Sequence, residues 1–319
     1  MPKPRHQLVD TQTTPYYHCI SRVVRRAFLC GFDPLSGRNF DHRKLWIAER
    51  LKQLVEIFAV DICAYALMSN HLHVIVHVDL ARARSWSDKE ATRRYERLFR
   101  RAVQDATLLP PKLRAHKLRQ WRERLSSLSW FMRCLNESIA RRANHEDNCS
   151  GRFWEGRFRS QALLDDGALL TCMAYVDLNP IRAGLAARPE DAVFTSIRER
   201  LLNAAKARTS PPGLMAFADQ VPKDSDSLPV RFDDYAEVVR FAAKAIRAEK
   251  AVVVPAAVAA RLDQHGLDSS NFIESLRNYP QRFFTMVGHV HRIETECARR
   301  GYKRRPGIGG ARRLYRNTA

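Results

Sequence analysis

Two histidines separated by one residue are the side chains of this sequence best suited to chemistry. His71-Leu72-His73 lies in an apolar run, and that run predicts a strand over residues 71–78. Because alternate residues of a strand point to the same face, His71 and His73 can reach one metal ion while Leu72 faces the core. The alternative is that both histidines only pack within a sheet.

A tyrosine later in the chain can act at the same ion. Tyr175 and Asn179 lie four residues apart in an apolar helical pattern, so their side chains share one helix face. Pro180 follows directly and predicts that this helix kinks or ends there. Together with the histidines, these residues indicate a metal-assisted phosphodiester nuclease whose nucleophile is a tyrosine. The alternative is that Tyr175 is only part of the apolar core.

The charge of the chain favours a nucleic-acid partner. Its 319 residues include 54 Lys and Arg against 34 Asp and Glu, a formal net charge of +20. Clustered cations gain affinity for DNA because binding releases counterions from the phosphates. The alternative is a basic protein without that role. No apolar stretch of ~18 residues could span a bilayer, and no signal-peptide core is seen. We therefore expect a cytoplasmic, nucleoid-associated protein without a membrane partner.

The seven cysteines are scattered and include no Cys-x-x-Cys pair. Such a pattern indicates reduced thiols rather than disulfides or a structural zinc site.

The elements around the histidines and the tyrosine predict an α+β fold. The order is strand, helix, strand, strand, helix, strand, helix, over residues 16–24, 41–58, 60–68, 71–78, 127–145, 151–164 and 167–185. This is the order of a ferredoxin-like unit with one added helix. We expect an antiparallel sheet with helices on one face, the other face being left for a ligand.

The rest of the chain predicts additions to this unit. Residues 1–205 form the expected main domain, interrupted by a basic helical insertion at about 81–126. That insertion is either a DNA clamp or a solvated helical hairpin. A linker over 206–231, a helical C-terminal domain over 232–299 and a basic tail over 300–319 are expected to follow. One hypothesis gives the C-terminal domain a helix-turn-helix role in binding duplex DNA.

Three strings resemble a known family. YALMSNHLHVIVHV, GRFWEGRFRSQALL and MAYVDLNPIRAGL, in that order, resemble the REP-associated tyrosine transposases, which are single-tyrosine transposases of the HUH nuclease superfamily. The resemblance covers about residues 15–200. His71 and His73 match the His-hydrophobic-His motif of that family, and Tyr175 matches its catalytic tyrosine.

The resemblance implies a mechanism. His71 and His73, with Asn179 as third ligand, would hold one Mg²⁺ or Mn²⁺ ion. Tyr175 would attack the scissile phosphate and form a 5′-phosphotyrosine, which a 3′-OH can later reverse without a nucleotide cofactor. The substrate would be single-stranded DNA beside a hairpin, as in repetitive palindromic elements, and the enzyme would be a monomer or homodimer. The alternatives are a catalytically silent DNA-binding protein of the same fold and a replication-initiator type of HUH nuclease.

Further DNA contacts are expected from arginines near the motifs. Trp154 with its neighbouring arginines could stack on bases and bind phosphates. The alternative is that Phe153 and Phe158 are core and only the arginines meet DNA. The expected DNA-binding residues are Arg22, Arg25, Arg26, Arg152, Trp154, Arg157 and Arg159.

Overall fold

The structure is a computed structural model of the chain. It describes residues 4, 8–24, 28–34, 36–207, 209–223, 225–248 and 252–316.

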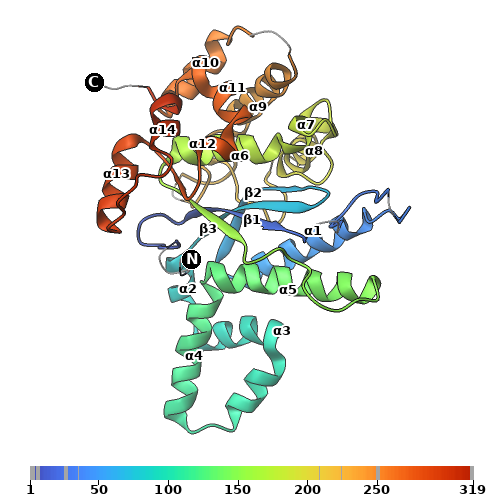
Figure 1. Cartoon of the computed structure of the whole chain (residues 1–319). Helices are drawn as coiled ribbons and strands as arrows, with labels where there is room; N and C mark the ends of the chain where they lie inside the picture. Colours follow the sequence, from blue (N-terminus) through green and yellow to red (C-terminus); the bar gives the residue numbers. More distant parts are fainter. Residues whose placement is uncertain are drawn as a thin grey trace.

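A five-stranded sheet lies at the centre of the molecule (Figure 1). The strands are β1 (Tyr16–Arg22), β2 (Val60–Leu67), β3 (His71–Val78), β4 (Arg159–Leu163) and β5 (Met286–Val287). Their spatial order is β2-β3-β1-β4-β5. The first four pair antiparallel, as the ferredoxin-like prediction requires, and the α+β class is confirmed. The fifth strand is parallel to β4 and makes the sheet mixed, which the sequence did not indicate.

Two helices cover one face of the sheet. Helix α1 (His42–Val55) packs against β2 and against α5 (Leu128–Glu146). Its buried stripe of Ile47, Leu51 and Leu54 has the helical spacing that predicted it. Figure 1 shows both helices below the sheet.

The opposite face is covered as well, so it is not left open as expected. Helix α6 (Asp166–Asp177) packs on β2, β3 and β4. All but its first residue are buried, as expected for a helix that is apolar on every side. The Asp165 side chain caps it by accepting from the Ala168 amide at 2.8 Å. The break predicted at Pro180 is confirmed, since α6 ends before the short α7 (Asn179–Arg182).

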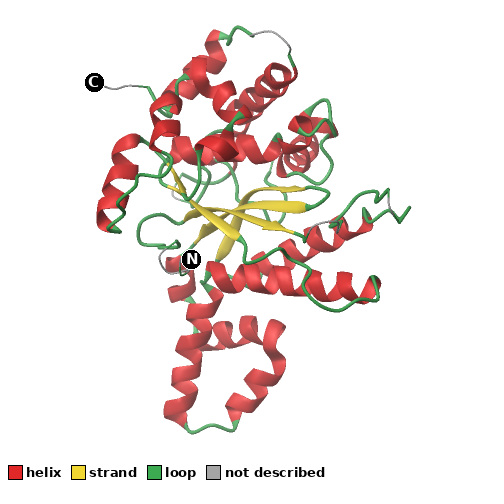
Figure 2. Cartoon of the chain, in the orientation of Figure 1, coloured by secondary structure: helices red, strands yellow, loops and turns green. Residues whose placement is uncertain are grey.

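The insertion after β3 forms a projecting arm. After the short α2 (Leu80–Ser85), α3 (Asp88–Thr107) and α4 (Pro111–Leu125) extend away from the sheet as two joined helices (Figure 2). We call residues 88–125 the arm. At its base, the rings of Tyr95 and Trp121 stack with centroids 4.9 Å apart. The predicted basic helices are therefore present as a helical hairpin.

The segment predicted as a linker packs against the sheet instead of spanning open space. Within it, Leu214, Met215, Phe217 and Leu228 are buried, and the Met215 amide donates to the Ile62 carbonyl at 2.8 Å. The segment packs there because its apolar residues complete the hydrophobic core beside β2.

The C-terminal region is helical, as predicted, but it also supplies β5 and shares the core of the sheet. The remaining helices are α8 (Ser196–Ala207), α9 (Phe232–Arg247), α10 (Ala256–Gln264), α11 (Ser269–Arg277), α12 (Tyr279–Arg282), α13 (Val290–Arg299) and α14 (Ile308–Leu314), with 3₁₀ turns at Pro189–Asp191 and Ala218–Gln220. The region expected as a basic tail thus includes α14. None of the helices in the described ranges is long and apolar enough to cross a membrane.

Candidate active site

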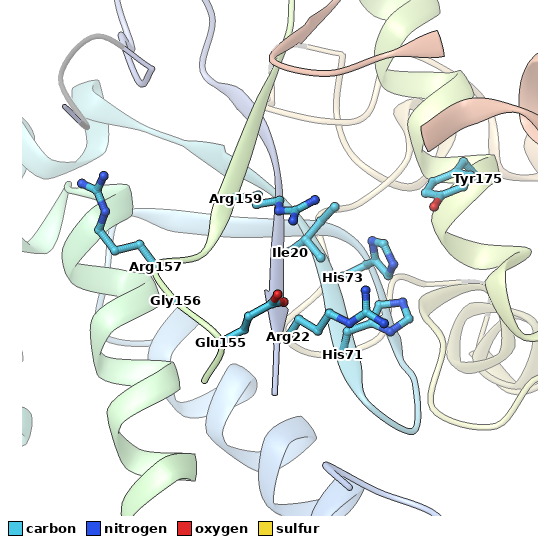
Figure 3. A pocket seen from close by; sticks show the side chains of 9 residues that line it. All are labelled: Ile20, Arg22, His71, His73, Glu155, Gly156, Arg157, Arg159 and Tyr175. Carbon is cyan, nitrogen blue, oxygen red and sulfur yellow. The ribbon is translucent and has the colours of Figure 1, made fainter. Parts of the chain in front are cut away.

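A hollow of about 410 Å³ brings the predicted catalytic groups together (Figure 3). We call it the histidine pocket. It is lined by residues of β1, β3, β4, α6 and the loop before β4, namely Ile20, Arg22, His71, His73, Glu155, Gly156, Arg157, Arg159 and Tyr175. Both predicted histidines, the predicted nucleophile and three of the predicted DNA-binding arginines therefore lie around one space.

Strand pairing explains how the side chains meet. In the antiparallel register of β1 and β3, Arg22 lies opposite His71, and Ile20 lies opposite His73. Opposed residues point to the same face of a sheet, which here is the face that carries α6. Ring centroids are 4.8 Å apart between His71 and His73, and 5.7 Å apart between His73 and Tyr175. Figure 3 shows the Tyr175 hydroxyl directed toward the histidine pair.

A third histidine, His18 of β1, supports His73 from behind. His18 is fully buried, and its Nε2 lies 2.8 Å from Nδ1 of His73. Its other ring nitrogen, Nδ1, lies 3.2 Å from the side-chain oxygen of Gln161. That oxygen also accepts from the Tyr279 hydroxyl at 2.7 Å.

This chain of contacts fixes the proton on each ring. The amide nitrogen of Gln161 donates to the Phe284 carbonyl at 3.2 Å, so the amide oxygen must face His18. An oxygen without a proton can only accept, and His18 therefore carries its hydrogen on Nδ1. Its Nε2 then accepts from Nδ1–H of His73, which leaves the lone pair of the His73 ring on Nε2. That atom is buried and has no hydrogen-bond partner among the described residues.

His71 has the same orientation. Its Nδ1 lies 2.6 Å from the side-chain oxygen of Asn70, and this contact favours the tautomer with the hydrogen on Nδ1 and the lone pair on Nε2. Burial, helped by the charge of Arg22, lowers the pKa of His71 to about 4. Burial likewise lowers the pKa of His18 to about 4 and that of His73 well below its usual range. All three rings are therefore neutral at neutral pH.

These observations fit a divalent metal. Neutral imidazoles with free Nε2 atoms are the form that binds metal, and a hydrogen bond on the opposite ring nitrogen is the usual support for such a ligand. Among the described residues, no group of three or more His, Cys, Asp or Glu side chains could hold an ion. The histidine pair would therefore need an amide oxygen, a phosphate or water to complete the coordination.

Tyr175 is held in a tight aromatic setting. Its ring is stacked on that of Tyr279, with centroids 4.3 Å apart, and the guanidinium of Arg182 lies 4.7 Å from its centroid. Burial raises the pKa of the Tyr175 phenol, while the charge of Arg182 and hydrogen bonds from Arg182 and Asn179 oppose that rise. The phenol is thus protonated at neutral pH in the metal-free chain, and Arg182 favours its ionised form.

Asn179, the predicted third ligand, is buried beside Tyr175 but does not line the histidine pocket. Its amide nitrogen donates to the Tyr175 carbonyl at 3.2 Å. The side-chain oxygen is then the atom that could serve as a ligand, and the assignment stays a prediction.

The arginine-rich loop before β4 is less of a stacking platform than expected. Phe153 and Phe158 are buried, and the half-buried Trp154 donates its ring N–H to the Asn136 carbonyl at 2.8 Å. These contacts favour the alternative in which the aromatic residues are core. Arg152 is exposed but lies outside the histidine pocket, and Arg25 and Arg26 lie outside the described residues.

Sequence reasoning missed His18, Gln161, Arg182 and Tyr279. His18 and Gln161 become visible only once the register of β1 with β3 and β4 is known. Arg182 lies seven residues after Tyr175 on the same helical face, and that spacing was an available signal. Tyr279 lies in the C-terminal region, where nothing in the sequence indicates a contact with the His71-Leu72-His73 motif or with Tyr175.

Comparisons with known proteins give little beyond this geometry. No family model matches the chain, and no curated protein matches it. A solved structure of a REP-associated tyrosine transposase bound to a REP hairpin matches with 12% sequence identity and a TM-score of 0.39. The match covers 73% of this chain and 99% of that chain. A likeness this loose carries no functional assignment, so a function for this chain rests on its own site.

Proposed function

We propose that this protein is a metal-dependent DNA strand transferase, a transposase-type enzyme that cleaves and rejoins single-stranded DNA through Tyr175. The observation that carries the proposal is the pairing of His71 and His73 beside a tyrosine directed at them, with a hydrogen-bond partner on Nδ1 of each ring and no partner on Nε2 of His73 among the described residues. A structural histidine pair would satisfy both ring nitrogens, whereas His73 leaves one buried and unpartnered among the described residues.

The residues have distinct roles in this proposal. His71 and His73, with the side-chain oxygen of Asn179, are the proposed ligands of one Mg²⁺ or Mn²⁺ ion. When bound, such an ion polarises the scissile phosphate and stabilises charge on it. The guanidinium groups of Arg22 and Arg159 line the same pocket and would orient the phosphate oxygens.

Tyr175 is the proposed nucleophile. Its oxygen forms a bond to phosphorus as the bond from phosphorus to the 3′ oxygen breaks. The phenol gives up its proton, and the departing 3′ oxygen gains one. The DNA 5′ end is then held on Tyr175, and a 3′-OH can reverse the step without a nucleotide cofactor. The positive charge of Arg182, which lies over the Tyr175 ring, stabilises the phenolate form of Tyr175.

The proposed substrate is an unpaired strand next to a hairpin, such as a repetitive palindromic element. A buried tyrosine can meet a phosphate only where the strand is free of its partner, and the cationic chain supplies general affinity.

A covalent-adduct gel tests this proposal. The protein is incubated with Mn²⁺ or Mg²⁺ and hairpin DNA that has a single-stranded flank, labelled at its 3′ end in one sample and at its 5′ end in another. We expect a denaturation-resistant protein band that carries only the 3′ label, because the 5′ end of the downstream fragment is the end joined to tyrosine. Tyr175→Phe and EDTA should each remove the band.

The matched control is Tyr16→Phe, a tyrosine of β1 that lines no part of the histidine pocket. It should leave the band intact. An adduct that survives Tyr175→Phe would refute the nucleophile. Tight binding without any adduct on several hairpins would instead favour the catalytically silent DNA-binding protein.

A further inference from the structure

A second hollow of about 750 Å³ adjoins the histidine pocket, and Tyr175 lines both. We call it the aromatic pocket. The residues that it does not share with the histidine pocket include Phe158, Gln161, Tyr279, Phe283, Phe284 and Thr285. A large part of its wall thus comes from the C-terminal region, at a distance of more than a hundred residues in sequence from Tyr175.

The C-terminal part of this wall is fixed to the catalytic sheet. The Tyr279 hydroxyl donates to the side-chain oxygen of Gln161 at 2.7 Å, and the Gln161 amide nitrogen donates to the Phe284 carbonyl at 3.2 Å. The Ala162 amide of β4 donates to the Thr285 carbonyl at 2.9 Å. With β5 paired to β4 just beyond, the wall is formed before any ligand binds.

The chemistry of the wall suits a flat, partly polar ligand. Phe283 and Phe158 are buried in the wall, but Phe284 is 62% exposed. A large aromatic side chain left in water beside a hollow offers a free stacking face. The Thr285 hydroxyl is buried and has no hydrogen-bond partner among the described residues. A planar ring system with a hydrogen-bonding edge would satisfy both groups.

We propose that the aromatic pocket binds one unpaired nucleobase of the DNA strand, the base adjacent to the phosphate that Tyr175 attacks. This inference rests on the function proposed above. Phe284 stacks on the base, the Thr285 hydroxyl bonds its edge, and Arg159, which lines both pockets, meets the backbone between base and scissile phosphate. The volume lies within the usual range of sites for small ligands.

The proposal gives the C-terminal region a role other than duplex recognition. The C-terminal region would form one side of the pocket that selects a base. It would thereby determine which phosphate of a single strand reaches Tyr175.

The test is made on the full chain in the Tyr175→Phe background, with EDTA present, so that binding is measured without cleavage. The probe is a short oligo(dT) strand carrying one 2-aminopurine, whose fluorescence falls when it stacks on an aromatic ring. We expect quenching on binding, and Phe284→Ala should remove it and weaken binding about tenfold, the usual worth of one base–aromatic stack.

Two further variants sharpen the result. Phe32→Ala removes an aromatic side chain of similar exposure, 59%, that lines neither pocket, and it should change nothing. Thr285→Val keeps the side-chain shape and should reduce the difference in affinity among oligo(dT), oligo(dA) and oligo(dC) strands. If the parent protein does not quench the probe, or if Phe284→Ala binds and quenches as the parent does, the proposal is wrong.

The failure of this proposal can be told apart from failure of the proposed function. An adduct on Tyr175 with unchanged binding in Phe284→Ala would leave the nuclease standing and remove the base pocket. Loss of quenching in Phe284→Ala without any adduct in the catalytically intact chain would keep the pocket and remove the nuclease.

Discussion

The histidine pocket and the tip of the arm differ in the burial and the pairing of their polar side chains. At the pocket, His73 and the His18 ring behind it are buried and neutral, and hydrogen bonds fix the position of the proton on each ring. At the arm tip, several basic side chains are exposed and have no acidic partner among the described residues, namely Arg100, Arg101, Lys112 and Lys117. Near the arm base, by contrast, Arg94 pairs with Glu90 and Arg97 pairs with Glu56.

Under the proposed function, the difference predicts that the two regions contribute to DNA processing in different ways. A ligand geometry fixed through several hydrogen bonds is sensitive to the loss of one atom. Solvated cations act through charge, so their effects are graded and screened by salt. We therefore expect point substitutions in the pocket to affect chemistry and substitutions at the arm tip to affect affinity.

The largest effect should come from His73→Ala. This change removes one of the two proposed histidine ligands of the metal, and adduct formation should fall to the level seen with EDTA. Titration calorimetry with Mn²⁺ should show no site-specific binding. The control is His77→Ala, a histidine four residues further along β3 whose Nδ1 lies 3.3 Å from a carboxylate oxygen of Asp61. An active His73→Ala protein would show that the pair does not hold the ion.

A smaller loss is expected from His18→Phe. This change keeps a ring in place but removes the acceptor that fixes the His73 proton, and it should weaken Mn²⁺ binding about 10- to 100-fold. The adduct should still form at saturating Mn²⁺. Calorimetry on the folded variant, checked by circular dichroism, measures the change. Unaltered Mn²⁺ affinity would show that His18 contributes only to packing.

Neutralising the arm tip should affect affinity alone. Replacing Arg100, Arg101, Lys112 and Lys117 with Gln should weaken hairpin binding and reduce the slope of log K against log salt by about 0.9 for each phosphate that the variant no longer neutralises. The rate of adduct formation at saturating DNA should be unchanged. The control neutralises Arg94 and Arg97, whose charges are already paired. Equal slopes in both sets would identify the arm as a solvated hairpin.

The last prediction concerns stability rather than DNA, because the free energy of unfolding of the metal-free protein should depend on pH. Because the folded pKa of His18 and His71, about 4, lies below the ordinary 6.5, the unfolded chain binds more protons between these values. Stability is therefore lost as pH falls from 6.5 toward 4, by up to about 1.4 kcal/mol per pH unit for each histidine. Asp177, whose pKa burial raises to about 6, opposes this trend.

Urea unfolding in EDTA at a series of pH values measures this slope. The His18→Phe protein should show a shallower dependence, because it has one titrating group fewer. A slope that is the same in the two proteins would argue that His18 is not neutral and buried in the folded chain.

The sequence predicted the parts of the site that follow from local periodicity. Alternation placed His71 and His73 on one face, and helical spacing placed Tyr175 near Asn179, because both patterns reflect geometry within one element. The same patterns predicted the four antiparallel strands and the helices α1 and α5 that connect them.

What the sequence did not reveal depends on contacts between distant segments. His18 is one residue of a short strand, and its neighbours in sequence do not indicate which residue of another strand its side chain will contact. Met286 and Val287 are too short a run to be read as a strand, and they pair with β4 only because the C-terminal helices bring them there. The apolar residues of the expected linker do not by themselves distinguish an exposed loop from a segment that packs in the core.

The late position of the aromatic wall in the chain has a consequence for biosynthesis. Protein synthesis runs from the N-terminus, so the segments that carry the histidines and Tyr175 leave the ribosome well before Tyr279 and β5 are made. A product terminated before Tyr279 would leave Gln161 without its bonds to Tyr279 and Phe284 and would leave backbone groups along one edge of β4 unpaired. We expect such fragments to be cleared by proteases, so that under the proposed function the surroundings of Tyr175 are complete only after the C-terminal region has been made.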